Sequence, residues 1–209
     1  MPAAPVRQSL GAMAALTRLC VFCGSAVGGR PVFAGAARAL AAELLRRRIG
    51  LVYGGGQVGL MGVLADAVLA GGGEVIGVIP RPLATREIAH GGLTRQHVVE
   101  TMHERKALMA ELSDGFVALP GGLGTFEETL EVLTWSQLGI HQKPLGLLDV
   151  DGFWSGLRAF FAHAAREGFL APRNLALLVD ADAPGPLLDR MAAWTPPPGP
   201  RLWLTLRET

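Results

Sequence analysis

The fold class of this chain is decided by residues 116–128, FVALPGGLGTFEE. Four apolar residues, Phe116 to Leu119, predict a strand buried on both faces, as in a parallel sheet. Pro120 ends that strand, and three glycines within the next four positions form a turn too tight for side chains. Thr125 is a good helix N-cap, with Glu128 three residues on as its capping-box partner. The pattern therefore predicts a strand, a glycine turn and a helix start in direct succession.

This succession leaves backbone N–H groups bare beside the positive end of a helix dipole. Such a site attracts an anion, most often a phosphate. A purely structural reading stays open, because every strand–helix connection needs a turn and a capping box alone would explain Thr125 and Glu128. A Gly-Gly-x-Gly run is, however, more than an ordinary connection requires. The run lacks the Gly-Lys-Ser/Thr of a P-loop and the spacing of a dinucleotide fingerprint.

Composition and charge narrow the class of protein. The 209 residues are 50% hydrophobic and 18% charged, which indicates a globular chain long enough for a full core. A net charge of +1 gives no electrostatic reason to expect nucleic acid or an anionic membrane as partner. Residues 1–17 make a poor signal peptide, and no apolar segment is long enough to cross a membrane. We therefore expect a cytoplasmic protein.

The two cysteines, Cys20 and Cys23, form a C-x-x-C pair within a predicted strand. Redox pairs of this spacing lie at a helix start, where the dipole lowers a thiol pKa. Residues three apart on a strand point to opposite faces, so we expect buried, inert thiols without a mutual disulfide. No cluster of histidine, cysteine and carboxylate has metal-ligand spacing, and His103 and His141 are expected on the surface or in supporting positions.

Short apolar runs alternate with helical ones along the chain. This order predicts an α/β fold that is Rossmann-like and doubly wound, a mostly parallel sheet with helices on both faces in a single domain. Residues 1–17 are interpreted as an N-terminal extension, 18–194 as the domain, and 195–209 as a Pro-rich tail. The predicted strands are 19–23, 51–53, 75–79, 97–99, 116–119, 145–148, 176–179 and 201–206, and the predicted helices are 31–48, 60–69, 102–112, 125–137, 152–167 and 184–193.

Two further glycine turns follow predicted strands, at Gly24-Ser25 and at Gly54-Gly55-Gly56. The second matches G-x-G-x-x-G as far as Gly59. The acidic residue of a dinucleotide site closes a strand, whereas Glu74 precedes one, so a NAD or flavin site is disfavoured. In an open α/β sheet the carboxyl ends of the strands share one crevice, so we expect the three glycine turns to converge there.

Arg105 lies in the middle of an apolar helical stripe and should point inward. A guanidinium in that position must meet a carboxylate or a ligand anion, because an unpaired buried charge is costly. Two readings stay open, a structural ion pair with Glu127 or Glu128 and a role in binding a ligand. Lys106 borders the same face and is one of only two lysines, the other being Lys143.

On these residues the chain resembles the LONELY GUY (LOG) family, cytokinin riboside 5′-monophosphate phosphoribohydrolases long mislabelled as lysine decarboxylases. The family pattern P-G-G-x-G-T-x-x-E is unbroken over Pro120–Glu128. Further matches run in order from about Leu19 to Leu170, which is most of the chain. They include CGS at 23–25, YGGG at 53–56, REI at 86–88, MHERK at 102–106, and a longer match at 134–144.

The resemblance implies release of a free base and ribose 5-phosphate from N6-modified adenosine monophosphate, and often from AMP. It implies Arg105 and Glu128 as the catalytic pair. Together with the apolar helices it also suggests a homodimer, with Thr134–His141 near the interface; no cofactor is expected. The glycine turns and the resemblance together give these expected substrate-binding residues: Gly24, Ser25, Gly55, Glu87, Arg105, Lys106, Gly121, Gly122, Leu123, Gly124, Thr125, Phe126, Glu127, Glu128 and Thr134.

The chemistry of such a reaction agrees with these residues. Cleavage of an N-glycosidic bond passes through an oxocarbenium-like state, which needs negative charge near the ribose and a placed water. Glu128 would supply both, Arg105 would orient it, and the Gly121–Thr125 amides would hold the 5′-phosphate. An alternative from another class is a nucleotide-binding or carrier protein of the same fold, without turnover. Decarboxylation would need PLP on Lys106 or Lys143 and is disfavoured.

Overall fold

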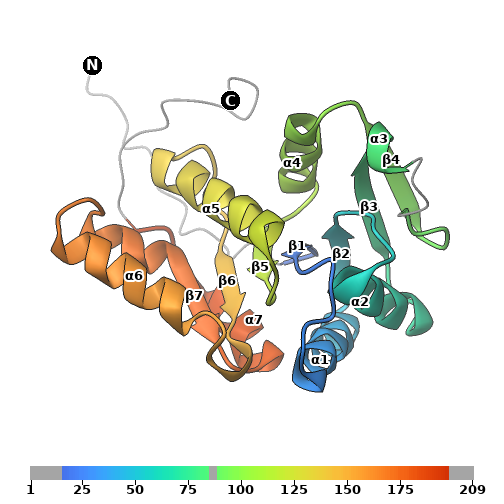
Figure 1. Ribbon diagram of the computed structural model, residues 1–209, viewed down its shortest axis with the longest axis horizontal. Helices are drawn as coiled ribbons and strands as arrows, with labels where there is room; N and C mark the ends of the chain where they lie inside the picture. Colours follow the sequence, from blue (N-terminus) through green and yellow to red (C-terminus); the bar gives the residue numbers. More distant parts are fainter. Residues whose placement is uncertain (1–15, 85–88, 198–209) are drawn as a thin grey trace, which may run out of the picture.

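The computed structural model describes residues 16–84 and 89–197, which form one sheet with helices on both of its faces (Figure 1). The seven strands follow the order β4-β3-β2-β1-β5-β6-β7, and every neighbouring pair is parallel. The predicted doubly wound parallel sheet is therefore confirmed. The strands are β1 (Arg18–Phe22), β2 (Gly50–Tyr53), β3 (Val75–Pro80), β4 (Arg95–Val99), β5 (Gly115–Ala118), β6 (Leu145–Leu148) and β7 (Leu178–Ala181).

Every helix except the last lies between two consecutive strands, as parallel pairing requires. They are α1 (Pro31–Arg47), α2 (Gly59–Ala70), α3 (Arg81–Ala84), α4 (Met102–Glu111), α5 (Leu123–Leu138), α6 (Ser155–Arg166) and α7 (Pro184–Ala193), with 3-10 turns at Val150–Gly152 and Pro172–Leu177. Within the described residues, no helix combines the length and the apolar character that crossing a membrane requires.

The strand order reverses between β1 and β5, so the loops that leave these two strands open onto one crevice. Their backbones touch there, because the Gly24 amide donates to the Pro120 carbonyl at 3.1 Å. A Cβ added to Gly24 would lie 3.3 Å from the Cα of Gly121. The loop after β2 joins them, since the Leu60 amide donates to the Gly24 carbonyl at 2.9 Å. The expected convergence of the three glycine turns is confirmed.

Buried side chains form an apolar layer on each face of the sheet. Leu40 of α1 and Leu64 of α2 belong to one layer, with α7; Met109 of α4 and Trp135 of α5 belong to the other (Figure 1). The cysteines follow the alternation of β1, since Cys23 lies in the first layer and Cys20 in the second. Both are buried free thiols, as expected, and burial raises the pKa of each.

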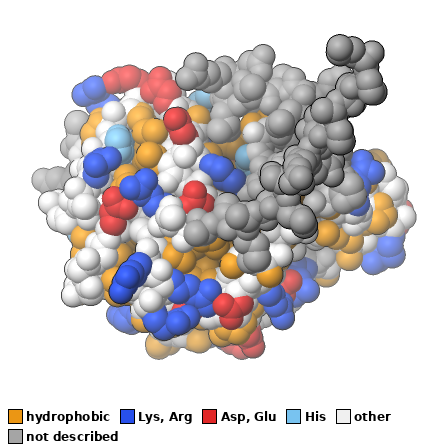
Figure 2. All heavy atoms as spheres, turned by 180° about the vertical axis from the view of Figure 1, so that it is seen from behind, with side chains coloured by type: hydrophobic (Ala, Val, Ile, Leu, Met, Phe, Trp, Pro, Cys, Tyr) orange, Lys and Arg blue, Asp and Glu red, His pale blue; other side chains and the backbone are white. Residues whose placement is uncertain are grey.

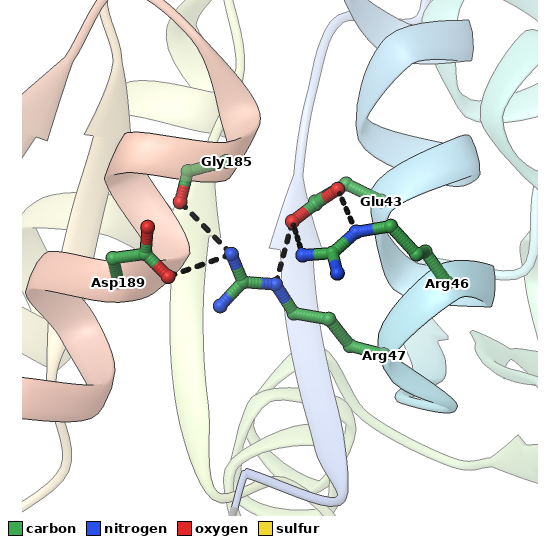
Figure 3. A network of polar contacts seen from close by, with 5 residues as sticks. All are labelled: Glu43, Arg46, Arg47, Gly185 and Asp189. Atoms are coloured by element: carbon green, nitrogen blue, oxygen red, sulfur yellow. Dashed lines mark hydrogen bonds and ion pairs between the residues drawn. The ribbon is translucent and has the colours of Figure 1, made fainter.

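A network of ion pairs ties α1 to α7 (Figure 3). The Glu43 carboxylate accepts from Arg46 and from Arg47, each at 2.6 Å. Arg47 reaches onward to Asp189 at 2.8 Å and to the Gly185 carbonyl at 3.1 Å. The hydrogen bond from Arg46, joined by the bond from Arg47, lowers the pKa of Glu43 to about 2 against the smaller opposing effect of burial. The network therefore joins α1, the first helix of the described residues, to α7, the last of them.

Several predicted elements differ from the structure in their limits, two of them in the last third of the chain. The helix expected from 152 begins at Ser155, because the Asp149 carboxylate accepts from the Trp154 amide at 2.7 Å and holds a 3-10 turn before it. The strand expected at 176–179 lies at 178–181, because the preceding residues form another 3-10 turn. The strand expected at 201–206 lies outside the described residues.

The molecular face in Figure 2 carries acidic and basic side chains side by side, with apolar ones between them, outside the residues drawn in grey. This mixture agrees with the net charge of +1, which gave no reason to expect a nucleic-acid partner.

Candidate functional site

The start of α5 differs from the sequence prediction in a way that matters for binding. The N-cap is Gly122, in an extended conformation and without a side-chain hydrogen bond, so the predicted capping box of Thr125 and Glu128 is wrong. A glycine at the N-cap lets the helix begin within the glycine run. Thr125 therefore falls inside the first turn, buried, and Glu128 turns toward Arg105. A capping box does form at the start of α4, between Thr101 and Glu104.

The uncapped start of α5 leaves the amides of Leu123, Gly124 and Thr125 without acceptors inside the helix. The next amide differs, because Phe126 N–H donates to the Gly122 carbonyl at 3.0 Å. Gly122, Leu123 and Gly124 are exposed, and a Cβ on either glycine would meet no atom within 4 Å. An anion can therefore approach the positive end of the helix dipole at the exposed residues Leu123 and Gly124.

Arg105 of α4 and Glu128 of α5 form a buried ion pair, each residue being 8% exposed. Arg105 Nη1 donates to Glu128 Oε1 at 2.6 Å, and Arg105 Nε donates to the Val78 carbonyl at 3.1 Å. The guanidinium lies against the β2 loop, where a Cβ on Gly54 would be 2.2 Å from Arg105 Nη2. The inward orientation predicted for Arg105 is confirmed, and its carboxylate partner is Glu128.

The surroundings of Glu128 make its carboxylate a stronger base than an exposed one. Burial raises the pKa of Glu128, and the charge and hydrogen bond of Arg105 only partly oppose this effect. Glu127 raises the pKa further, while Lys106 lowers it. A general base works best when its pKa approaches the working pH, so these surroundings suit proton abstraction.

A hollow of about 290 Å³ opens at the crevice between the β1 and β5 loops. The expected binding residues Gly24, Ser25, Gly121 and Gly122 line it, with Phe33 and Phe153 among the apolar side chains of its wall. Phe33 belongs to the apolar layer of α1 and α2, whereas the Arg105–Glu128 pair joins α4 to α5. The hollow is therefore lined by the glycine loops, and neither Arg105 nor Glu128 is among its lining residues.

Two of the expected binding residues make contacts within the protein, Phe126 through its side chain and Gly55 through its backbone. The Phe126 ring packs edge-on against Trp154 at 5.7 Å between centroids and tilts against Phe153 at 6.4 Å. Gly55 is buried with φ +75°, and its carbonyl accepts from the His90 amide at 2.9 Å. A Cβ at position 55 would lie 3.2 Å from the Cβ of Ile79, so the β2 loop can approach β3 only with glycine there.

The remaining expected residues lie at different distances from the pair. Lys106 and Glu127 adjoin it and bond to each other at 2.5 Å. Thr134 is exposed and donates to the Leu130 carbonyl of its own helix at 2.8 Å. Thr134 lies six positions after Glu128, which is about 9 Å along the helix axis and roughly 120° around it. Glu87 lies outside the described residues.

Sequence reasoning missed Glu131 and the Val78 carbonyl. Glu131 Oε2 lies 2.9 Å from Lys106 Nζ, and its spacing of four residues from Glu127 was a usable signal, because such residues share a helix face. The Val78 carbonyl gave no signal, since a backbone acceptor is present at every position.

His141 and Lys143 serve the fold. Nε2 of His141 lies 2.9 Å from the Val132 carbonyl, and burial lowers the pKa of His141 to about 4. Lys143 Nζ donates to the Ala110 and Ser113 carbonyls, both at 2.6 Å, and so closes the carboxyl end of α4. With Lys106 held by carboxylates, both lysines of the chain have engaged ammonium groups, which does not suit a lysine that forms a Schiff base with PLP.

Comparison with known proteins identifies related sequences. The family described as "Possible lysine decarboxylase" matches residues 61–191. A probable cytokinin riboside 5′-monophosphate phosphoribohydrolase of Oryza sativa subsp. japonica is 53% identical over 178 residues, covering 85% of this chain and 80% of that protein. A cytokinin riboside 5′-monophosphate phosphoribohydrolase of Arabidopsis thaliana is 50% identical over 179 residues, covering 86% of this chain and 84% of that protein.

Solved structures share the fold at lower sequence identity. The Moco carrier protein from Chlamydomonas reinhardtii superposes with a TM-score of 0.63 at 20% identity, covering 84% of this chain and 97% of that one. The molybdenum cofactor binding protein from Rippkaea orientalis gives a TM-score of 0.61 at 19% identity, covering 84% and 94%. These likenesses establish a common architecture.

Proposed function

The chain belongs to the family of cytokinin riboside 5′-monophosphate phosphoribohydrolases, and we propose that it hydrolyses the N-glycosidic bond of adenosine 5′-monophosphates. Its substrates would include N6-modified forms, and its products a free base, cytokinin or adenine, and ribose 5-phosphate. The observation that carries this proposal is the buried Arg105–Glu128 pair, placed next to the uncapped start of α5.

The 5′-phosphate binds at the start of α5 in this proposal. The free amides of Leu123, Gly124 and Thr125 donate to phosphate oxygens, and the helix dipole favours the negative charge. Gly121 permits the approach of the neighbouring loops, because a Cβ there would lie 2.8 Å from the Gly24 amide nitrogen. Ser25, exposed in the same hollow, offers a hydroxyl to the nucleotide.

Glu128 carries the chemistry. As the bond to the base breaks, positive charge develops on the ribose, and the carboxylate stabilises it. The same carboxylate removes a proton from the attacking water, a contribution worth roughly 10²–10⁴-fold in rate, and the departing base gains a proton in exchange, so that it leaves neutral. Arg105 fixes the carboxylate through its bond to Oε1, while its own orientation is fixed by the Val78 carbonyl. The general base Glu128 and the arginine that orients it thus come from two helices, α5 and α4, on the same face of the sheet.

We also propose a homodimer whose interface includes α5 and α6, which lie side by side in Figure 1. None of the α6 side chains is fully buried, and Phe160 is 62% exposed. On α5, Leu130 and Leu138 are 38% and 39% exposed. A second copy that covers these side chains would also lie near Thr134, which is exposed on the same helix, α5. Light scattering on the purified protein would detect a mass of one chain if this proposal is wrong.

The experiment that tests the activity is product analysis. The purified protein is incubated with AMP and, separately, with isopentenyladenosine monophosphate, and the free base and ribose 5-phosphate are quantified by chromatography. Equimolar release of both products supports the proposal. Tight nucleotide binding without release would instead favour the carrier alternative of the same fold. The cytoplasmic location expected from the sequence stays a prediction, which fractionation of cells that make the protein would test.

A further inference from the structure

His90 makes three hydrogen bonds that join separate segments of the chain. Its ring nitrogen Nδ1 accepts from the Gly92 amide at 3.1 Å, and Nε2 lies 2.9 Å from Asp66 Oδ1. Because Nδ1 accepts, the proton of the neutral imidazole is on Nε2, which donates it to Asp66. The backbone amide of His90 donates to the Gly55 carbonyl at 2.9 Å. His90 therefore links the segment before β4 to α2 and to the β2 loop.

The imidazole is nearly enclosed, whereas its carboxylate partner is not. The side chain of His90 is 12% exposed and that of Asp66 is 73% exposed. A contact with so exposed a carboxylate adds little to the stability of a fold. Its main effect is therefore to fix where the imidazole and the surrounding backbone lie.

The β2 loop lies between this segment and the catalytic arginine. On one side, Gly56 forms an isolated antiparallel bridge with Ala89, the neighbour of His90. On the other side, a Cβ on Gly54 would lie 2.2 Å from Arg105 Nη2. The loop residues 54–56 are all glycine, so no side chain separates the two contacts. A shift of the segment would pass to the guanidinium through the backbone alone.

Close packing against β3 leaves the loop little room to move independently. A Cβ on Gly77 of β3 would lie 2.9 Å from the Cα of Gly55 and 2.4 Å from Leu93 Cδ1. The β2 loop, β3 and the segment 89–93 are therefore packed as one unit. The imidazole of His90 ties this unit to α2.

We propose that His90 is a positioning residue for the catalytic pair. Its imidazole holds the segment 89–92 in place, so that the β2 loop seats the Arg105 guanidinium against Glu128. A histidine suits this role because its ring accepts at one nitrogen and donates at the other, in different directions. His90 does not touch the substrate. The inference rests on the function proposed above, but its structural part is testable without turnover.

Substitutions of His90 can remove its two side-chain bonds separately. Asparagine has a carbonyl oxygen near the place of Nδ1 and keeps the bond from the Gly92 amide, as in an Asx-turn, but does not reach Asp66. Glutamine has an amide nitrogen near the place of Nε2 and keeps the bond to Asp66. Alanine keeps neither. The matched control is His163→Ala, which removes another histidine near a carboxylate, Glu167 at 3.8 Å, on the surface of α6.

AMP hydrolysis and AMP affinity by calorimetry separate positioning from binding. We expect His90→Ala to lower kcat roughly tenfold while KM and the AMP Kd stay within roughly twofold, since small misplacements of reacting groups are costly. His90→Asn and His90→Gln should each recover part of kcat. Asp66→Ala should match His90→Asn, because both lose the same bond, and His163→Ala should keep full activity. Wild-type kcat in His90→Ala, or an AMP Kd raised roughly tenfold, would overturn the inference.

NMR of the Arg105 side chain gives a measurement that needs no turnover. The Arg105 Nε–H donates to the Val78 carbonyl, so its resonance reports where the guanidinium lies. In His90→Ala this resonance should shift and its exchange with water should become faster, with no change in His163→Ala. An unchanged resonance would overturn the inference, and so would equally faster exchange at the Trp154 amide, which reports general unfolding. If the wild type releases no base, the proposed function fails independently, and this resonance still decides the inference.

Discussion

Replacing Gly54 by alanine should disable the Arg105–Glu128 pair without changing either of its members. The new Cβ would lie 2.2 Å from Arg105 Nη2 and 3.4 Å from Arg105 Cζ. Gly54 has no positive φ, so alanine strains no backbone angle and acts through this contact alone. The guanidinium cannot move freely, because it is bonded to the Val78 carbonyl and to Glu128.

The size of the effect follows from this geometry. Relief of the contact needs a shift of Arg105 by about 1 Å, a misplacement that costs on the order of a hundredfold in rate when the group takes part in catalysis. Complete removal of one partner from a buried ion pair costs about 3–5 kcal/mol of stability. A displaced guanidinium keeps part of its attraction to Glu128. We therefore expect a loss of about 1–3 kcal/mol in the free energy of unfolding.

Urea unfolding and AMP hydrolysis measure the two consequences. Gly35→Ala is the matched control, because Gly35 lies exposed within α1 and its added Cβ would meet no atom within 4 Å. That control should keep full activity and gain about 0.5–1 kcal/mol, the usual advantage of alanine over glycine in a helix. Wild-type stability and kcat in Gly54→Ala would refute the reasoning, since Arg105 would then have room that the structure does not show.

Three further changes test the supporting structure. Lys143→Met deprives the carbonyls of Ala110 and Ser113 of their donor and should lower the free energy of unfolding by about 1–3 kcal/mol, with KM for AMP unchanged; equal urea midpoints would contradict this. The pKa of His141 falls from 6.5 to about 4 on folding, so the unfolded chain binds its proton first. Stability should be lost as pH falls through that window, by up to about 1.4 kcal/mol per pH unit, and His141→Phe should flatten the dependence in thermal melts. Glu43, whose pKa is lowered from 4.5 to about 2, stabilises above pH 4.5 and loses this effect as pH falls. Glu43→Gln should therefore cost about 1 kcal/mol at pH 7 but little near pH 2, and an equal loss at both would count against the network.

The fold could be predicted from the sequence because its signals are local. Buried strands of a parallel sheet appear as short apolar runs, and the glycine turns after β1, β2 and β5 mark where each strand ends. Their convergence follows from the geometry of parallel strands, so it needed no knowledge of contacts. The opposite burial of Cys20 and Cys23 follows in the same way from the alternation of a strand.

The parts that could not be predicted depend on contacts between distant segments. Thr125 and Glu128 match a capping box, but Arg105 competes for the Glu128 carboxylate, and the helix begins earlier, after Gly122. The sequence placed an inward guanidinium near a carboxylate without deciding between Glu127 and Glu128. The same holds for the strand at 178–181, where a 3-10 turn shifts the limits of an otherwise apolar run.

The expected binding residues also divide into those that local sequence predicts and those whose position depends on distant contacts. The glycines and backbone amides at the start of α5 could be recognised from the sequence, because their role does not depend on a contact with a distant side chain. Side chains are harder: Phe126 faces the core, and Thr134 lies about 9 Å along α5 from the pair. Glu131 shares a helix face with Glu127, but the lysine opposite it comes from another helix, so the spacing alone did not identify the ion pair.

The most direct test of the account is the Glu128→Gln variant, assayed with AMP for both turnover and affinity. Glutamine keeps the size of the side chain and an acceptor for Arg105 but cannot act as a base. We expect kcat to fall by roughly 10²-fold or more while the AMP Kd changes little, since the phosphate amides are untouched. Turnover near that of the wild type would show that the buried carboxylate of α5 does not perform the reaction.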